Sequence, residues 1–132
     1  MLYLDTSALM KLIRREPESD ALADWLDAQT PAPWVSSTLI EIELPRALRL
    51  IEPSLLARVP AMLARVARYE VDELVRAAAA AYPDTTLRSL DAIHLATGDA
   101  VLGTQLTAFV TYDERLLPAA AAAGLPTAAP GR

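Results

Sequence analysis

Four acidic residues stand where strands are expected to end or helices to begin, and carboxylates gathered in this way could bind a divalent metal. Asp5 directly follows a short apolar run, and Asp113 comes soon after another. Asp91 falls in the first turn of an expected helix, and Glu43 lies a short helical segment beyond a third expected strand. Because the carboxyl ends of parallel strands meet at one edge of a sheet, these four residues can converge although they are far apart in the sequence.

Such a cluster needs a cation. Each carboxylate raises the pKa of its neighbours, and removal from water adds to this effect. Ligation by oxygen alone favours Mg²⁺ or Mn²⁺ over Zn²⁺. A metal-activated water could then attack a phosphodiester while the metal stabilises the developing charge, and four acids leave room for two metals.

Each acid also has a simpler structural interpretation. Asp5 could cap the helix that follows it, and Asp91 could be a first-turn acid favoured by the helix dipole. Asp113 could be a turn residue or a cap, and Glu43 could be a solvated acid on a helix. The four together form a stronger signal than any one of them.

Strands and helices are expected to alternate along the chain. Short apolar or β-forming runs predict strands at residues 2–4, 34–36, 69–71 and 106–111, with a possible edge strand within the tail 125–132. Helical spacing of apolar residues, with caps and breakers, predicts helices at 8–15, 19–29, 39–50, 53 onward, 73–82, 89–102 and 115–123. The alternation predicts an α/β fold with a parallel sheet covered on both faces.

Two prolines complicate the middle of this pattern. Residues 39–44 partly alternate as a strand would, but 43–50 continues with good helix formers, so a helix is favoured. Pro45 should bend that helix because it removes an interior hydrogen bond. Pro60 should interrupt or kink the helix that Pro53 opens.

Length and composition narrow the class of protein. A chain of 132 residues is enough for one domain, so 1–132 is expected to be a single unit. The net charge of −5 argues against binding nucleic acid through bulk charge, although a bound metal could supply the positive field that a nuclease needs. The sequence has no cysteine, no apolar run long enough for a bilayer and no signal-peptide pattern. We therefore expect a cytoplasmic protein without a membrane partner.

Four short motifs, each built around one of the acids, occur in register along the chain. They are LDTSA at 4–8, ELPRAL at 43–48, LDAIHLAT at 90–97 and VTYDERL at 110–116. Together they resemble the PIN domain, and more narrowly the VapC toxins of bacterial VapBC toxin–antitoxin pairs. Single motifs are weak, but four in the right order and spacing are specific.

The resemblance implies a three-layer α/β/α fold with a central parallel sheet of four or five short strands. It implies an endoribonuclease dependent on Mg²⁺ or Mn²⁺, with Asp5, Glu43, Asp91 and Asp113 as catalytic residues and metal ligands. It also implies a VapB-like antitoxin that blocks the site, often through an inserted basic residue, together with homodimers and toxin–antitoxin hetero-oligomers. A PIN-like DNA nuclease or RNA-processing enzyme without an antitoxin is the alternative. The complete set of acids speaks against a non-catalytic binding module.

Several neighbouring residues are candidates for supporting roles. Thr6 and Ser7 could hydrogen-bond the site carboxylates as well as cap a helix, and Thr111 could orient a metal-bound water. Arginines close to the acids in sequence could contact phosphates, although each could equally be an exposed helix residue. These are Arg46, Arg49, Arg88 and Arg115.

Three further residues compete for places in the site. Glu41 and Glu43 point nearly opposite ways on a helix, and the spacing of the resemblance selects Glu43. Asp99 is expected to be a solvated acid rather than a ligand. His94, the single histidine, lies one turn from Asp91, but we favour a partly buried histidine tied to a neighbour over a ligand or general base.

Overall fold

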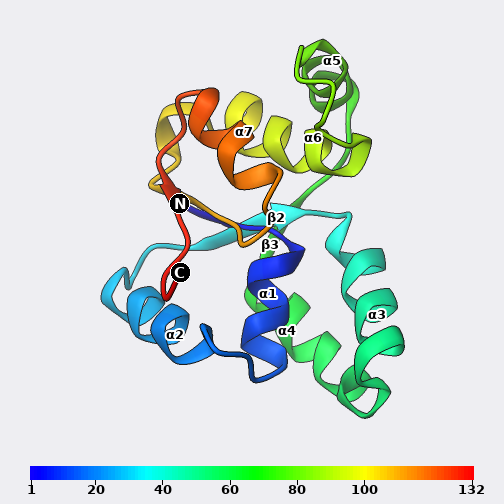
Figure 1. Ribbon diagram of the computed structural model, residues 1–132, viewed down its shortest axis with the longest axis vertical. Coiled ribbons are helices and arrows are strands. Elements are labelled where there is room, and N and C mark those ends of the chain that lie inside the picture. The colour runs from blue at the N-terminus through cyan, green and yellow to red at the C-terminus, as the bar shows by residue number, and fades with distance from the viewer.

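A parallel sheet of five short strands runs through the structure, a computed structural model that describes residues 1–132 (Figure 1). The strands lie in the order β3-β2-β1-β4-β5, and all four pairings are parallel. The chain moves outward from β1 first on one side and then on the other, which makes a switch point between β1 and β4. The strands are β1 (Leu2–Leu4), β2 (Trp34–Ser37), β3 (Ala67–Tyr69), β4 (Ala108–Val110) and β5 (Thr127–Ala128).

Helices cover both faces of this sheet (Figure 1). One face carries α1 (Thr6–Ile13), α2 (Ser19–Ala28), α3 (Ile40–Ile51) and α4 (Val59–Arg65), and the other carries α5 (Glu73–Ala81), α6 (Ser89–Ala96) and α7 (Leu116–Ala122). Three short helices complete the chain: the 3₁₀ helices η1 (Pro53–Arg58) and η3 (Gly103–Gln105), and the π-helix η2 (Thr97–Leu102). The predicted three-layer α/β/α fold is confirmed. None of the helices has the length and apolarity needed to cross a bilayer.

Residues of strand β1 pack alternately against the helices on the two faces of the sheet. Successive strand residues point to opposite faces of a sheet. Leu2 and Leu4 join the core cluster beneath α1 to α4, whereas Tyr3 joins the cluster beneath α6, η2 and α7. All three are fully buried, and burial of each such side chain contributes about 1.5–3 kcal/mol. A strand buried on both faces reads as an uninterrupted apolar run.

The boundaries of several elements differ from the predictions. Helix α1 spans Thr6–Ile13 rather than 8–15, and strand β4 spans Ala108–Val110 rather than 106–111. Strand β3 spans Ala67–Tyr69 rather than 69–71, because all three of its residues are exposed on the edge of the sheet and no buried face marks its register. The 3₁₀ helix that Pro53 opens ends at Arg58, and Pro60 lies in the first turn of α4, where a missing N–H costs nothing; the interruption predicted at Pro60 is therefore present. The helix predicted at 39–50 is confirmed, and α3 runs through Pro45.

The helix predicted at 89–102 changes at Thr97 from α to π geometry before Gly103 ends it with φ +52°. Within the π segment, Gly98 passes close to the sheet. A Cβ at Gly98 would lie 2.6 Å from Cδ2 of Phe109, whose fully buried ring is stacked on Tyr3. The absence of a side chain at Gly98 therefore allows α6 and η2 to approach the sheet.

We expect Gly98→Ala to lower the free energy of unfolding by about 1–3 kcal/mol, because the added methyl group must displace a packed aromatic ring. Urea unfolding monitored by circular dichroism would measure the change. Ala100→Ser, at an exposed position in the same π segment, is the control and should shift stability by less than about 0.5 kcal/mol. An unchanged midpoint in Gly98→Ala would contradict this close approach.

Candidate functional site

A pocket of about 390 Å³ opens at the carboxyl edge of the sheet, beside α1, α3 and α6. Its lining includes all four predicted acids: Asp5, Glu43, Asp91 and Asp113. The structure thus brings to one place residues that come from the ends of β1 and β4 and from two helices. Thr6 and Ser7 also line this pocket, whereas Thr111 lies buried directly behind it.

Asp5 carries strand β1 into helix α1. Its backbone N–H donates to the carbonyl of Val110 at 3.2 Å, which extends the pairing of β1 with β4 by one residue. Its Oδ1 accepts from the N–H of Ala8 at 2.9 Å and the hydroxyl of Ser7 at 2.6 Å, and its Oδ2 accepts from the hydroxyl of Thr111 at 2.5 Å. Asp5 is therefore the N-cap of α1, and three donors fix its carboxylate.

Burial dominates the electrostatics of Asp5, which is only 3% exposed. Burial raises the pKa of the Asp5 carboxyl above its ordinary range. The charge of protonated His94 and the hydrogen bonds from Ser7, Thr111 and Ala8 oppose this shift but do not cancel it. A negative charge at Asp5 is thus disfavoured by the fold and would be stabilised by a nearby cation.

Two side chains, those of Thr6 and His94, form hydrogen bonds with Glu43. Its Oε1 accepts from the hydroxyl of Thr6 at 2.8 Å and lies 2.7 Å from Nε2 of His94. Burial alone would raise the pKa of Glu43, but the hydrogen bond and charge of His94, together with the bond from Thr6, leave that pKa below its usual value. Glu41 is exposed, forms an ion pair with Arg68 at 3.2 Å and does not line the pocket.

The charge of Asp113 acts on the carboxyl group of Asp91. Burial, and next the charge of Asp113, raises the pKa of Asp91. Asp113 also caps a helix start, because its Oδ1 accepts from the N–H groups of Arg115 and Leu116, both at 2.8 Å. Its own N–H donates to the hydroxyl of Thr111 at 3.1 Å. The capping role that the sequence allowed for Asp113 is present in the structure, alongside its place in the pocket.

The donor set of the pocket is rich in oxygen. No group of three or more His, Asp or Glu side chains lies close enough to hold one ion directly between them. Mg²⁺ does not need three such side chains, because it keeps several waters and takes only one or two carboxylates directly. The carboxylates and hydroxyls present are thus compatible with a hydrated divalent ion and unsuited to a closed Zn²⁺ site.

One wall of the pocket carries a basic residue that the sequence analysis did not single out. Lys11 is the only basic side chain, apart from His94, that lines the pocket. Its ammonium group pairs with Glu16 at 3.2 Å and Glu18 at 2.8 Å and lies 4.7 Å from the ring centre of Tyr112. Its position four residues after Ser7, on the same face of a helix, could have indicated this placement.

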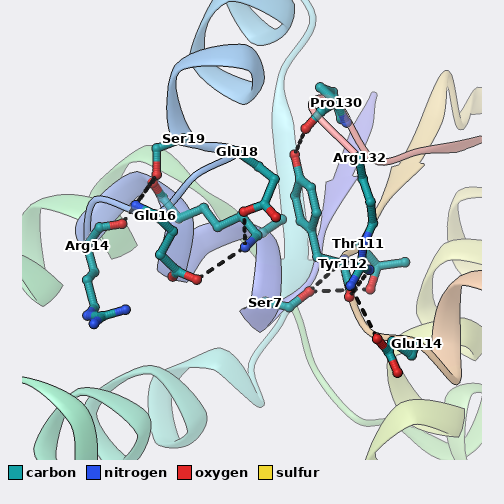
Figure 2. Close-up of polar contacts among 12 residues, drawn as sticks. Ser7, Arg14, Glu16, Glu18, Ser19, Thr111, Tyr112, Glu114, Pro130 and Arg132 are labelled. Atoms are coloured by element: carbon teal, nitrogen blue, oxygen red, sulfur yellow. Dashed lines mark hydrogen bonds and ion pairs between the residues drawn. The ribbon is translucent and has the colours of Figure 1, made fainter.

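The C-terminal segment fastens the loop that follows β4. Tyr112 donates its hydroxyl hydrogen to the carbonyl of Pro130 at 2.7 Å, and its own carbonyl accepts from Arg132 (Figure 2). The backbone N–H of Tyr112 donates to the hydroxyl of Ser7 at 2.9 Å. Because Tyr112 lies between Thr111 and Asp113, the last residues of the chain help to hold this side of the pocket in place.

The remaining predicted residues lie outside the pocket. The arginines Arg46, Arg49, Arg88 and Arg115 are exposed, and none lines it. Asp99 is also outside, but it is not the solvated acid that was expected, because it is partly buried and accepts a hydrogen bond from the hydroxyl of Tyr82 at 2.9 Å. His94, by contrast, lines the pocket and is more deeply placed than expected, with 3% of its surface exposed.

The family model described as the PIN domain matches residues 2–122. The chain therefore belongs to the PIN domain family, and the resemblance found in the sequence is confirmed. It is 56% identical to "Ribonuclease VapC35" of Mycobacterium tuberculosis, over 100% of this chain and 98% of the relative. It is 43% identical to "Ribonuclease VapC47" of the same species, over 99% of this chain and 98% of that protein.

A solved structure, "Structure of FitAB bound to IR36 DNA fragment", contains a chain of the same fold. The match has a TM-score of 0.60 and covers 100% of this chain and 96% of that chain. At 19% sequence identity, this likeness supports the fold alone.

We expect Thr111→Val to lower the free energy of unfolding by about 1.5–3 kcal/mol, because it leaves the buried carboxylate of Asp5 and the N–H of Asp113 without this hydroxyl. Urea unfolding would measure the loss. Thr111→Ser keeps the hydroxyl and removes only a methyl group, so it should cost about 0.8 kcal/mol. Equal stability of Thr111→Val and the unaltered protein would show that the hydroxyl does not support these two residues.

Proposed function

We propose that this chain is a VapC-type endoribonuclease, the toxin of a type II toxin–antitoxin pair, acting as one nuclease domain over 1–132. The observation that carries the proposal is the presence of Asp5, Glu43, Asp91 and Asp113 in one pocket at the carboxyl edge of the sheet. Similarity over the full length to proteins named Ribonuclease VapC supports RNA as the substrate. An RNA substrate and a sequence without cysteine favour a cytoplasmic location.

We propose that the four carboxylates hold Mg²⁺ or Mn²⁺. When bound, such an ion supplies an activated water for attack on the phosphodiester and stabilises negative charge at phosphorus. Asp5 is fixed for this role by its three donors, and Glu43 by Thr6 and His94. Asp91 and Asp113 repel each other, so each favours a cation in the space that they share.

A protein partner is part of the proposal. Helix α3 exposes large apolar side chains at Ile42, Leu50 and Ile51, which are 61%, 85% and 52% exposed. Ile51 also lines the acidic pocket. A VapB-like antitoxin could cover this apolar surface and place a basic side chain among the acids, and homodimers and hetero-oligomers would bury other exposed apolar residues.

We expect Asp91→Asn to reduce the rate of RNA cleavage about a hundredfold or more, because a metal ligand contributes several kcal/mol to the transition state. EDTA should abolish cleavage by the unaltered protein, and Mg²⁺ or Mn²⁺ should restore it. A defined RNA and the DNA of the same sequence would serve as substrates.

Asp99→Asn is the matched control, since Asp99 follows Asp91 by eight residues on the same helical run but lies outside the pocket. It should cleave RNA at the unaltered rate. Full activity in Asp91→Asn, or cleavage that persists in EDTA, would refute the metal site. Cleavage of DNA alone would favour the DNA nuclease over the ribonuclease.

We further expect the exposed arginines that lie near the acids in the sequence to bind RNA phosphates. Arg46→Gln, Arg88→Gln and Arg115→Gln should each weaken RNA binding and reduce the slope of log Kd against log salt by about 0.7 for each phosphate that the arginine neutralises. Fluorescence anisotropy with the inactive Asp91→Asn protein would measure both. Arg15→Gln, which alters an exposed arginine paired with Asp20, is the control. If the three arginine variants and the Arg15→Gln control gave the same slope, these arginines would have no role in phosphate binding.

A further inference from the structure

A chain of hydrogen bonds runs from the core of the sheet to the pocket. Tyr3 on β1 is fully buried, and its ring stacks on Phe109 with centroids 4.7 Å apart. The hydroxyl oxygen of Tyr3 lies 2.6 Å from Nδ1 of His94, and Nε2 of His94 lies 2.7 Å from Oε1 of Glu43. One buried imidazole on α6 thus joins a core residue to one of the four acids.

The chemistry of the three groups fixes where the protons lie. A carboxylate can only accept, so Nε2 of His94 must carry a proton to bond Glu43. In the neutral ring, Nδ1 then accepts from the hydroxyl of Tyr3, whose pKa burial raises well above its usual range. In the protonated ring, Nδ1–H donates to the Tyr3 oxygen instead. In both states, Tyr3 holds the ring so that Nε2–H faces Glu43.

Glu43 is held differently from Asp5 and Asp113. Asp5 has a short side chain and three donors, and Asp113 is held by two backbone N–H groups. Glu43 has a longer side chain, and both of its donors, Thr6 and His94, bind Oε1. This arrangement leaves Oε2 free of protein donors and available to the pocket.

We infer that His94 is a positioning residue that, oriented by Tyr3, holds Oε1 of Glu43 and so presents Oε2 to a divalent cation. The consequence for catalysis rests on the proposed function, whereas the hydrogen-bond chain itself belongs to the free protein. Loss of a partner that orients a metal ligand typically costs about 10–100-fold in metal affinity or activity.

The chain has a single histidine, so its imidazole can be observed without overlap. Long-range ¹H–¹⁵N spectra of the metal-free protein should show a proton on Nε2, in either the neutral or the charged ring. A neutral ring protonated on Nδ1 would overturn the inference. Tyr3→Phe keeps the stacked ring and removes the hydroxyl that bonds Nδ1, so it should shift the ¹⁵N resonance of Nδ1, and an unchanged resonance would refute the orienting role of Tyr3.

Two substitutions of His94 separate positioning from packing. The amide nitrogen of Gln can occupy the place of Nε2 and donate to Glu43, whereas Leu fills the space without a donor. His94→Leu should lower Mn²⁺ affinity, measured by calorimetry, and kcat for RNA cleavage by about 10–100-fold, with KM little changed. His94→Gln should restore most of both.

Unfolding midpoints of the two variants would establish that both are folded. Equal losses of Mn²⁺ affinity in His94→Gln and His94→Leu would show that His94 acts only through packing and would refute its positioning role. A protein that shows protonated Nε2 and loses Mn²⁺ affinity in His94→Leu, yet cleaves no RNA in its unaltered form, would refute the proposed function while supporting the positioning role.

Discussion

Repulsion among the carboxylates at one edge of the sheet is the constraint on which the rest of the structure depends. The fold disfavours charge at Asp5 through burial, and at Asp91 through burial and the nearby Asp113. Donors from several elements hold the acids in place against this repulsion: α1 and the loop after β4 bind Asp5, α1 and α6 bind Glu43, and the start of α7 binds Asp113. The hydrogen bonds from the N–H groups at helix starts also fix the orientation of the carboxylates of Asp5 and Asp113. The same contacts therefore cap helices and orient possible metal ligands.

Much of this arrangement could be predicted from local signals. The buried apolar run at 2–4 and the glycines Gly103 and Gly124, which follow η2 and α7, each reflect strong preferences of the backbone or of burial, and each is present in the structure. The prediction for strand β3 was wrong by two residues because an exposed edge strand lacks the burial that fixes register. The interruption predicted at Pro60 is present, because a proline is tolerated in the first turn of a new helix but not as the continuation of the preceding one.

The site was predictable to the extent that topology alone determines it. Parallel strands place their carboxyl ends together, so the convergence of the acids followed from the alternation of elements. The surroundings of the acids depend instead on how helices pack across the sheet. The role of His94 requires knowledge that α6 faces the pocket from the side of β1 opposite to α1, which no local pattern encodes.

Strand β1 couples the core to the pocket through its alternation. Tyr3 and Asp5 are two residues apart along an extended segment, so both belong to the same side of the strand. Asp5 enters the pocket directly, and Tyr3 reaches it through His94 and Glu43. A displacement of β1 would therefore move one acid and release the support of a second. Because Phe109 packs on Tyr3 and Gly98 packs on Phe109, the close approach of η2 to the sheet also contributes to the position of the site.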